Sequence, residues 1–452
     1  MDLKTALRRI KPKKKEEKAM KRLSDKIMKV SEKLAENFKP MICGSVAKGT
    51  WLSNKNEIDL FLLFSPSLPR KKLEEEGLKA AKSIIKKLRG KYEIAYAEHP
   101  YLRGHARKYQ IDIVPCYDIK NPEKIQSAVD RTPHHVRYIK QNLLYPDEVR
   151  LLKQFCMANR VYGADVKTLG FSGYLCELLI LKYGGFQDLV REASKWRAGH
   201  VIIFTEIDKK HAIQKFKNPL IVIDPIDRNR NVAAAVSVES FYKFVKACKE
   251  YMRRPSIEFF FPKKIKPPSV REIAKKIQSR GTEFFVLEFK RPDVVDDVLY
   301  PQARRFLNNL ESVLKNNDLR LHRKDFFSNK TCYLILEFDI WKVPKIDKNI
   351  GPNIFSKHAE EFLKHYKKAK VFIENENWVV EKERQFTDAL SFLKDFFSKN
   401  ENEMLKNGVP NNLVKTLKKI KITSGKKLSI VLKDKGFRAF MKEYFEKDLN
   451  VI

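Results

Sequence analysis

Two neighbouring stretches decide the fold of this chain: residues 44–51, GSVAKGTW, and residues 57–64, EIDLFLLF. The first has the composition of a short, flexible turn. The second predicts a strand, because its apolar residues recur with period two from Ile58 to Phe64. Side chains two residues apart point to the same face of a strand, so Glu57 and Asp59 stand side by side. The sequence therefore places two side-by-side carboxylates on a strand that begins twelve residues after the Gly-Ser turn.

Such a pair favours a metal site. Neighbouring carboxylates raise each other's pKa, and a bound divalent cation removes the conflict. Oxygen ligands suit Mg²⁺. The backbone N–H groups of the turn and the hydroxyl of Ser45 suit a phosphate oxygen. These parts together predict a metal-dependent nucleotide site.

A third carboxylate interrupts another short apolar strand, residues 109–115 (YQIDIVP). Burying Asp112 there without a partner would be costly. Beside the first strand, Asp112 would complete a cluster of three carboxylates that could hold two metal ions for a phosphoryl displacement. The alternative is that Glu57 and Asp59 lie on a solvated strand face and that Asp112 caps a turn.

The composition points to a large polyanionic partner. The chain has 452 residues, 43% hydrophobic and 33% charged, which is typical of a folded protein of about three domains. Its formal net charge is +36, with 92 Lys and Arg against 56 Asp and Glu. The basic excess is strongest in residues 1–30 and 413–442. Nucleic acid is the partner this favours, whereas lysine-rich helices of a heat-adapted protein are the alternative.

The cysteines and the apolar segments indicate in which cellular compartment the protein works. The six cysteines form no CxxC or CxxxC pair, which argues against a zinc site or a disulfide framework and favours reduced core residues in a cytoplasmic protein. No apolar stretch approaches the length of a membrane span, and the N-terminal residues lack the apolar h-region expected of a signal peptide. The basic N-terminal helix could bind a membrane surface, but its apolar 3, 4, 3, 4 spacing favours docking on the protein's own core.

The order of predicted elements divides the chain into three parts of an α+β multidomain protein. Residues 1–137 alternate helix and strand around one mixed sheet, with a helix near 70–88 and a strand near 92–98. Residues 138–255 are mainly helical, with a strand at 220–223. Residues 256–452 form a second α+β domain, with strands at 257–261, 282–289 and 332–341, a helix near 301–315 and a basic helical tail near 385–447.

These motifs resemble the DNA polymerase β-type nucleotidyltransferase superfamily, and within it the archaeal, class I CCA-adding enzymes (tRNA nucleotidyltransferases). The carboxylate signature gives only the superfamily. The more specific segments are RTPHH, VYGADVKTLGFSGYLCELL and RPDVVDDVLYPQ. The similarity runs from residue 41 to about residue 387. It implies a catalytic head, a helical central domain that binds nucleotide and tRNA, and an RRM-like C-terminal domain that binds tRNA.

The resemblance implies an enzyme that adds C, C and A to tRNA 3′ ends from CTP and ATP with Mg²⁺. By position, Glu57, Asp59 and Asp112 would be the catalytic metal ligands, with Asp112 nearest the attacking hydroxyl. The nucleotide-binding residues would be Ser45, Lys48, His135, Lys153, Tyr162 and Arg230, with His134 as a neighbour and Asp224 holding the loop of Arg230. The family usually has Arg where Lys48 stands, and a lysine offers a point charge instead of a bidentate fork. Without the resemblance, a core histidine, a snorkelling lysine and a core-edge tyrosine would explain His135, Lys153 and Tyr162.

The C-terminal domain lacks the aromatic signature with which RRM sheets stack bases. We therefore expect it to hold tRNA by shape and phosphate contacts, with Arg304, Arg305 and the tail lysines as candidates. A poly(A) polymerase-like terminal transferase and a non-catalytic basic RNA-binding protein are the alternatives in function. The sequence is compatible with a homodimer but does not determine the oligomeric state.

Overall fold

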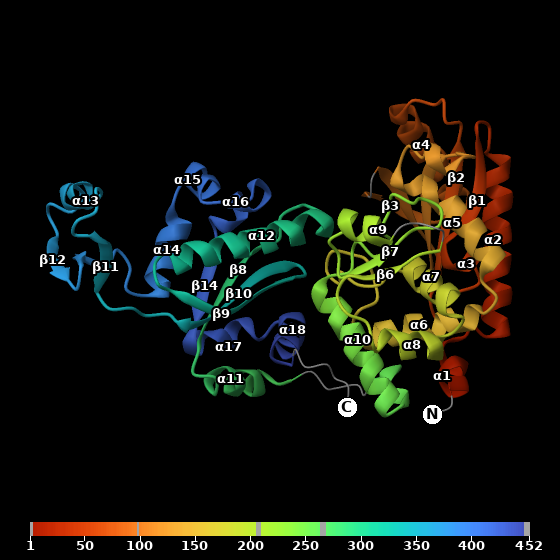
Figure 1. Ribbon diagram of the computed structural model, residues 1–452. Coiled ribbons are helices and arrows are strands. Elements are labelled where there is room, and N and C mark those ends of the chain that lie inside the picture. The colour runs from red at the N-terminus through yellow and green to blue at the C-terminus, as the bar shows by residue number, and fades with distance from the viewer. Residues whose placement is uncertain (1–2, 97–98, 205–208, 263–267, 447–452) are drawn as a thin grey trace. The chain divides into compact units, whose positions relative to one another are not determined.

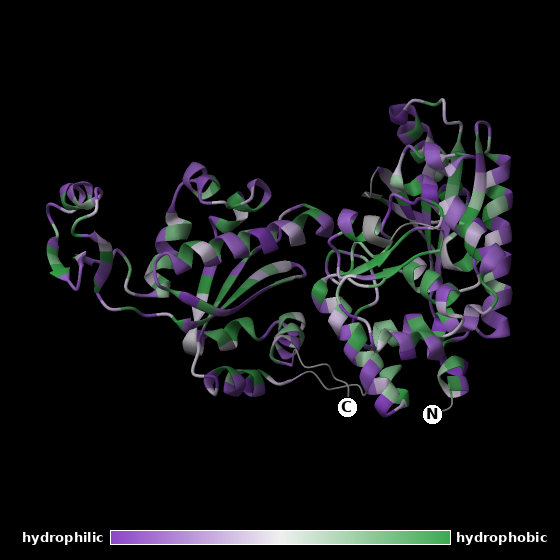
Figure 2. Ribbon diagram, viewed as in Figure 1, coloured by the Kyte–Doolittle hydropathy of each residue, from purple (hydrophilic) through white to green (hydrophobic). Residues whose placement is uncertain are grey.

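The computed structural model describes residues 3–96, 99–204, 209–262 and 268–446 (Figure 1). The described residues up to 262 form one compact unit, and residues 268–446 form a second. Figure 2 shows hydrophobic residues along the strands of both units and hydrophilic residues on the outer sides of the helices. All six cysteines are buried and unpaired.

The first unit contains one five-stranded sheet in the order β1-β2-β5-β4-β3. β2 and β5 are parallel and the other pairs are antiparallel, so the sheet is mixed, as predicted. Within this sheet, β4 is the strand that the sequence did not predict. The elements of this part are α1 (Leu3–Ile10), α2 (Lys14–Lys33), β1 (Phe38–Cys43), α3 (Gly44–Ala47), β2 (Glu57–Phe64), α4 (Arg70–Lys87), β3 (Lys91–Tyr96), β4 (Pro100–Ala106) and β5 (Tyr109–Tyr117). The last two residues of the strand predicted near 92–98 lie outside the described residues.

Alternate residues of β2 serve two different cores. Its even-numbered residues, from Ile58 to Phe64, pack with side chains of α2 and α4. Phe61 and Leu63 point the other way and pack with Val136 of α5 (Arg131–Asn142). The same alternation places Glu57 and Asp59 on the α5 side of the sheet.

The central part of the first unit is helical, as predicted, and is built around Phe155. The ring of Phe155 contacts the aromatic rings of Phe186, Phe244 and Tyr251, among others. Two residues of α1, Ala6 and Ile10, belong to this core. The elements are α6 (Pro146–Ala158), α7 (Gly173–Tyr183), α8 (Phe186–Ala193), β6 (His200–Ile202), α9 (Lys209–Lys215), β7 (Leu220–Val222) and α10 (Val238–Arg253), with β6 and β7 parallel.

The strand predicted at 257–261 is wrong. Residues Ile257–Phe259 form a short 3-10 helix, η3. Phe259 and Phe260 are buried against Phe155 in the helical core. The apolar side chains of this segment are therefore buried by packing as a turn, and the segment does not pair in a sheet.

The second unit contains a four-stranded antiparallel sheet in the order β14-β8-β10-β9. Numbered along the chain, this is the order 4-1-3-2 of a βαββαβ domain, which agrees with the predicted RRM-like outline. A three-stranded sheet, β11-β13-β12, is inserted between β10 and β14. The elements are α11 (Val270–Gln278), β8 (Glu283–Lys290), α12 (Asp296–Lys315), β9 (Arg320–Ser328), β10 (Thr331–Ile340), β11 (Ile346–Asn353), α13 (Ala359–His365), β12 (Lys370–Glu374), β13 (Asn377–Glu383), α14 (Ala389–Ser398), α15 (Glu401–Lys406), α16 (Asn411–Leu417), β14 (Lys421–Ser424), α17 (Leu428–Val431) and α18 (Lys435–Phe445).

Helices cover both faces of this four-stranded sheet. α12 and α14 lie on one side, and α11, α17 and α18 lie on the other (Figure 1). Most of the predicted basic tail is helical, but it also supplies the edge strand β14 and buries Leu432, Phe437 and Met441 in the core. Its final residue lies outside the described part. No described helix combines the length and the apolar character that a membrane span requires.

Candidate active site

The central sheet brings the predicted carboxylates together. β2 and β5 are parallel neighbours, and Asp59 is the register partner of Asp112. Glu57, two residues earlier on β2, lies on the same face and is exposed. The residues at 111 and 113 pack in the opposite core with α2 and α4, so Asp112 points to the α5 side as Asp59 does.

Gly44 lets the turn approach Asp59 closely. Its φ is +63°, and a Cβ added there would lie 1.7 Å from Oδ2 of Asp59. Any other residue at position 44 would displace the carboxylate. Glycine is therefore required at position 44 so that the turn can lie against Asp59. Ser45, the next residue, belongs to α3.

The carboxylates carry the electrostatic conflict expected of a cation site. Burial raises the pKa of Asp59, and Asp112 and Glu57 raise it further, to about 6, although Lys48 acts in the opposite direction. Oδ1 of Asp112 accepts hydrogen bonds from Arg103 and Gln110, at 3.3 and 3.1 Å. In the described part of the chain, no three acidic, His or Cys side chains already converge as metal ligands. By donor chemistry, the three oxygen-bearing side chains on one sheet face fit a divalent cation.

Helix α6 holds the far side of the turn. Arg150 is buried and donates from Nε to the carbonyl of Trp51 at 2.8 Å and from Nη2 to that of Gly49. Lys153, one turn later, donates to the carbonyl of Thr50 at 3.2 Å. Two cations of one helix thus fix three successive carbonyl groups beside the Gly-Ser turn.

Lys48 and Lys153 share one buried carboxylate, Glu177 of α7. Nζ of Lys48 hydrogen-bonds Oε2, and Nζ of Lys153 lies 3.4 Å from Oε1. Thr50 also donates to Oε1, at 2.6 Å. Burial raises the pKa of Glu177, but the two lysines outweigh it and hold that pKa below its ordinary value. Burial lowers the pKa of Lys153, and Glu177 opposes that change.

Tyr162 lies beside this cluster. A Cβ added to Gly173, at the start of α7, would lie 3.2 Å from the hydroxyl of Tyr162 and 3.6 Å from Nζ of Lys153. Burial raises the pKa of Tyr162, so its hydroxyl stays protonated and can donate a hydrogen bond. The structure therefore brings together Lys153 and Tyr162, which the family resemblance predicts to bind the nucleotide.

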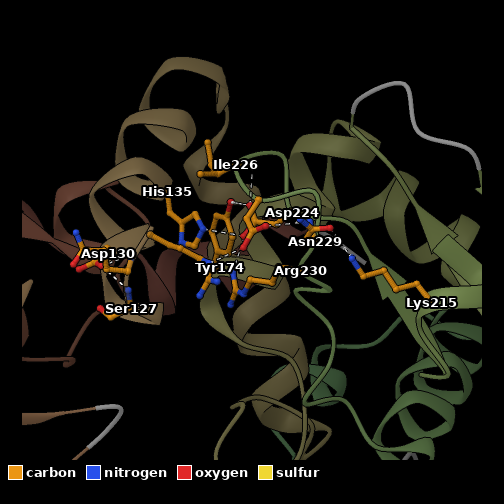
Figure 3. A network of polar contacts seen from close by, with 12 residues as sticks. Ser127, Asp130, His135, Tyr174, Lys215, Asp224, Ile226, Asn229 and Arg230 are labelled. Atoms are coloured by element: carbon orange, nitrogen blue, oxygen red, sulfur yellow. Dashed lines mark hydrogen bonds and ion pairs between the residues drawn. The ribbon is translucent and has the colours of Figure 1, made fainter. Parts of the chain in front are cut away.

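Asp224 is the hub of a second network, shown in Figure 3. Its buried carboxylate accepts hydrogen bonds from His135 at 2.9 Å, Tyr174 at 3.1 Å and Arg230 at 2.7 Å, and from the backbone N–H of Ile226 at 3.0 Å. Although burial raises the pKa of Asp224, its hydrogen bond with His135 leads the contacts that lower it to about 2. The Asp224 carboxylate thus holds the loop of Arg230, as predicted.

The two networks meet at Tyr174. Its ring stacks on the His135 ring, with centroids 3.9 Å apart. Nζ of Lys48 lies 5.7 Å from the centroid of the Tyr174 ring. Burial lowers the pKa of His135, so at neutral pH the ring is uncharged and its Nε2–H donates to Asp224.

Other predicted residues lie apart from these contacts. His134 points the other way, and its Nε2 lies 2.8 Å from the carbonyl of Ile119, which makes it a satisfied core histidine. Arg304 and Arg305 belong to α12 in the second unit. Arg305 is exposed, whereas Arg304 lies over the ring of Tyr300.

Sequence reasoning missed four residues of the site: Thr50, Arg150, Tyr174 and Glu177. One of them carried a signal. Glu177 stands in a helix that is apolar all round, which indicates a buried charge in need of a partner. Nothing in the spacing says which cations pair with it, because those lie 24 and 129 residues away.

Comparison with known families agrees with this architecture. Three family models match successive parts of the chain. They are described as a nucleotidyltransferase domain, at residues 25–135, a tRNA nucleotidyltransferase second domain, at residues 147–261, and a CCA-adding enzyme C-terminal domain, at residues 280–425.

Whole-chain relatives are similar over most of their length. The CCA-adding enzyme of Methanocaldococcus jannaschii is 41% identical over 418 residues, which are 88% of this chain and 90% of that enzyme. The CCA-adding enzyme of Methanothermobacter thermautotrophicus is 37% identical over 88% of both chains. That of Methanosarcina mazei is 36% identical over 98% of both chains. Together with the carboxylates, the Gly-Ser turn and the lysine cluster, these matches show that the chain belongs to the family of CCA-adding enzymes, the tRNA nucleotidyltransferases.

Proposed function

We propose that this protein adds C, C and A to the 3′ end of tRNA from CTP and ATP, without a nucleic-acid template. The observation that carries the proposal is the pairing of Asp59 with Asp112 in register, against Gly44 and beside Lys48. Carboxylates next to a cationic, amide-rich turn provide both a cation site and a phosphate site, which nucleotidyl transfer requires.

Each part of the site has a role in this reaction. Glu57, Asp59 and Asp112 would hold Mg²⁺, which when bound supplies stabilisation of negative charge on the reacting oxygens. The 3′-hydroxyl oxygen of tRNA bonds to the α-phosphorus of the nucleotide, the bond from that phosphorus to the bridging oxygen breaks, and pyrophosphate leaves. Asp112 is our candidate for the group nearest the hydroxyl and for the acceptor of its proton.

The neighbouring residues would position the nucleotide. Ser45, Lys48, Lys153 and Tyr162 offer hydroxyl and ammonium donors to the triphosphate. Arg230, oriented by Asp224, would help to read the base together with the RNA backbone. His135 presents an uncharged ring against Tyr174 at the same place.

The second unit would hold tRNA through its shape and phosphates. The face of the sheet that RRM domains leave open for bases is covered here by α11, α17 and α18. Exposed cations such as Arg305 are the candidate contacts. The buried, unpaired cysteines fit a cytoplasmic location.

The test is incubation of the purified protein with Mg²⁺ and a tRNA that lacks its terminal CCA. Each labelled nucleotide is supplied singly and in combination, and products are resolved to one nucleotide. Two additions with CTP, one more with ATP and then arrest are expected. Open-ended AMP addition would assign a poly(A) polymerase activity instead, and tRNA binding without incorporation would assign a binding protein.

A further inference from the structure

The two lysines at Glu177 use different numbers of their hydrogen-bond donors. An ammonium group has three donor hydrogens. Nζ of Lys153 makes three contacts, with the carbonyl and the hydroxyl of Thr50 at 3.2 and 3.1 Å and with Glu177 at 3.4 Å. Lys48 makes one hydrogen bond, to Glu177, and lies over the ring of Tyr174. Among the described contacts, Lys48 is therefore the lysine with donors left for a phosphate.

The charge at this cluster is unbalanced. The side chains of Lys48, Lys153 and Glu177 are 8%, 3% and 1% exposed. Two buried cations thus share a single ion-paired carboxylate, and a buried charge that is incompletely paired is costly. The surplus positive charge suits an incoming triphosphate, which would complete the neutralisation.

We infer that Glu177 is a positioning residue of the triphosphate subsite, which holds Lys48 in place with Lys153 behind it. The inference rests on the proposed function. Glu177 does not touch the substrate in this account. It acts through Lys48, which bridges the carboxylate and a phosphate oxygen.

The reason lies in what would remain without the carboxylate. Without Glu177, neither buried ammonium group keeps its ion-pair partner. Burial and Lys48 already lower the pKa of Lys153, so loss of its proton relieves the repulsion between the two groups. The other titratable groups facing the two lysines are Cys43 of β1, Tyr174 and Cys176 of α7, His135 of α5, Tyr162, and Asp59 of β2. Among the described ion pairs, the only carboxylate that either lysine contacts is Glu177. In a variant without this charge, triphosphate binding must then be accompanied by uptake of a proton by the protein.

The test is titration of inorganic tripolyphosphate into the full-length wild type and into Glu177→Gln without Mg²⁺, by calorimetry at pH 7 and pH 9. We expect the variant to bind about tenfold more weakly at pH 7, since one of the two cations is lost. The ratio of the variant and wild-type dissociation constants should rise with pH, because the variant must take up a proton on binding. The ratio cancels the titration of tripolyphosphate itself. An unchanged or tighter affinity in Glu177→Gln, or a ratio that is constant with pH, would overturn the inference.

Two further variants separate positioning from folding. Glu337→Gln removes another buried carboxylate, which accepts hydrogen bonds from Arg280, Thr282 and Tyr444 in the second unit. It should lose stability without losing tripolyphosphate affinity. Glu177→Asp keeps the charge on a shorter side chain. It should bind severalfold more weakly with a ratio independent of pH, and wild-type affinity in this variant would contradict positioning.

The inference and the proposed function can fail separately. If the wild type adds CCA but Glu177→Gln binds tripolyphosphate as well as the wild type does, only the role of Glu177 is wrong. If the variants behave as expected and no nucleotide is added to tRNA, the triphosphate subsite stands and the proposed reaction is wrong.

Discussion

Replacing Gly44 with Ala tests whether the turn and Asp59 form one site. The new Cβ would lie 1.7 Å from Oδ2 of Asp59, whereas real Cβ atoms essentially never approach closer than 3.0 Å. The carboxylate must therefore move by at least about 1.3 Å. A misplacement of about 1 Å at a reacting centre costs roughly 100-fold in rate, or about 2.7 kcal/mol of transition-state stabilisation. We expect kcat/KM for CMP addition to fall by at least about 100-fold.

Gly49→Ala is the matched control. Gly49 also has a positive φ, +69°, but a Cβ there would meet nothing within 4 Å. Both substitutions therefore cost the same left-handed backbone strain, about 1–2 kcal/mol of stability. The assay is single-turnover CMP addition to a tRNA lacking CCA, together with thermal unfolding of each variant. Equal activity in the two variants would refute the idea that the turn approaches Asp59 closely for catalysis.

The other predictions concern the remaining networks. Asp224→Asn should raise KM for CTP and ATP by about tenfold or more without changing the KM for tRNA, because Arg230 loses the anion that orients it; an equal rise in the KM for tRNA would contradict this. Glu337 is buried, which raises its pKa, but hydrogen bonds led by that of Arg280 lower it below the ordinary 4.5. Its contribution to stability is therefore present above pH 4.5 and is lost as pH falls through the lower folded-state pKa. The free energy of unfolding, measured with denaturant, should therefore fall less steeply with decreasing pH below 4.5 in Glu337→Gln than in the wild type. If Arg304 or Arg305 contacts a tRNA phosphate, its replacement by Ala should reduce the slope of log Kd for tRNA against log salt by about one, whereas an unchanged slope would remove that residue from the interface.

The carboxylate core could be predicted from sequence because it depends on local periodicity. The two-residue alternation of β2 and the single Asp in β5 are enough to put Asp59 and Asp112 on one face once the strands are neighbours. The pairing of those strands was an expectation that the fold confirms. The same alternation could not reveal β4, Pro100–Ala106, because Gly104 takes a buried position there and Arg and His interrupt its apolar residues.

The partners of buried charges could not be predicted in the same way. Glu177 is paired with lysines 24 and 129 positions away, and Arg150 and His135 reach Trp51 and Asp224 over 99 and 89 positions, so these contacts are fixed only when the helices pack. The nearer pairs, Asp147 with Arg150 and Asp224 with Arg230, lie within a few residues of each other. The prediction of a strand at residues 257–261 was wrong for a related reason. Its apolar residues fit a strand or a buried turn equally well, and the pocket around Phe155 decided between them.

The most direct test of the central claim is CCA addition by Asp59→Asn and Asp112→Asn, with the wild type beside them. Each protein is given Mg²⁺, CTP, ATP and a tRNA lacking its terminal CCA, and tRNA affinity is measured on the same preparations. We expect the wild type to add three nucleotides and stop, and both variants to bind tRNA nearly as well but add none. Wild-type rates in either variant would contradict a catalytic centre built on these two strands.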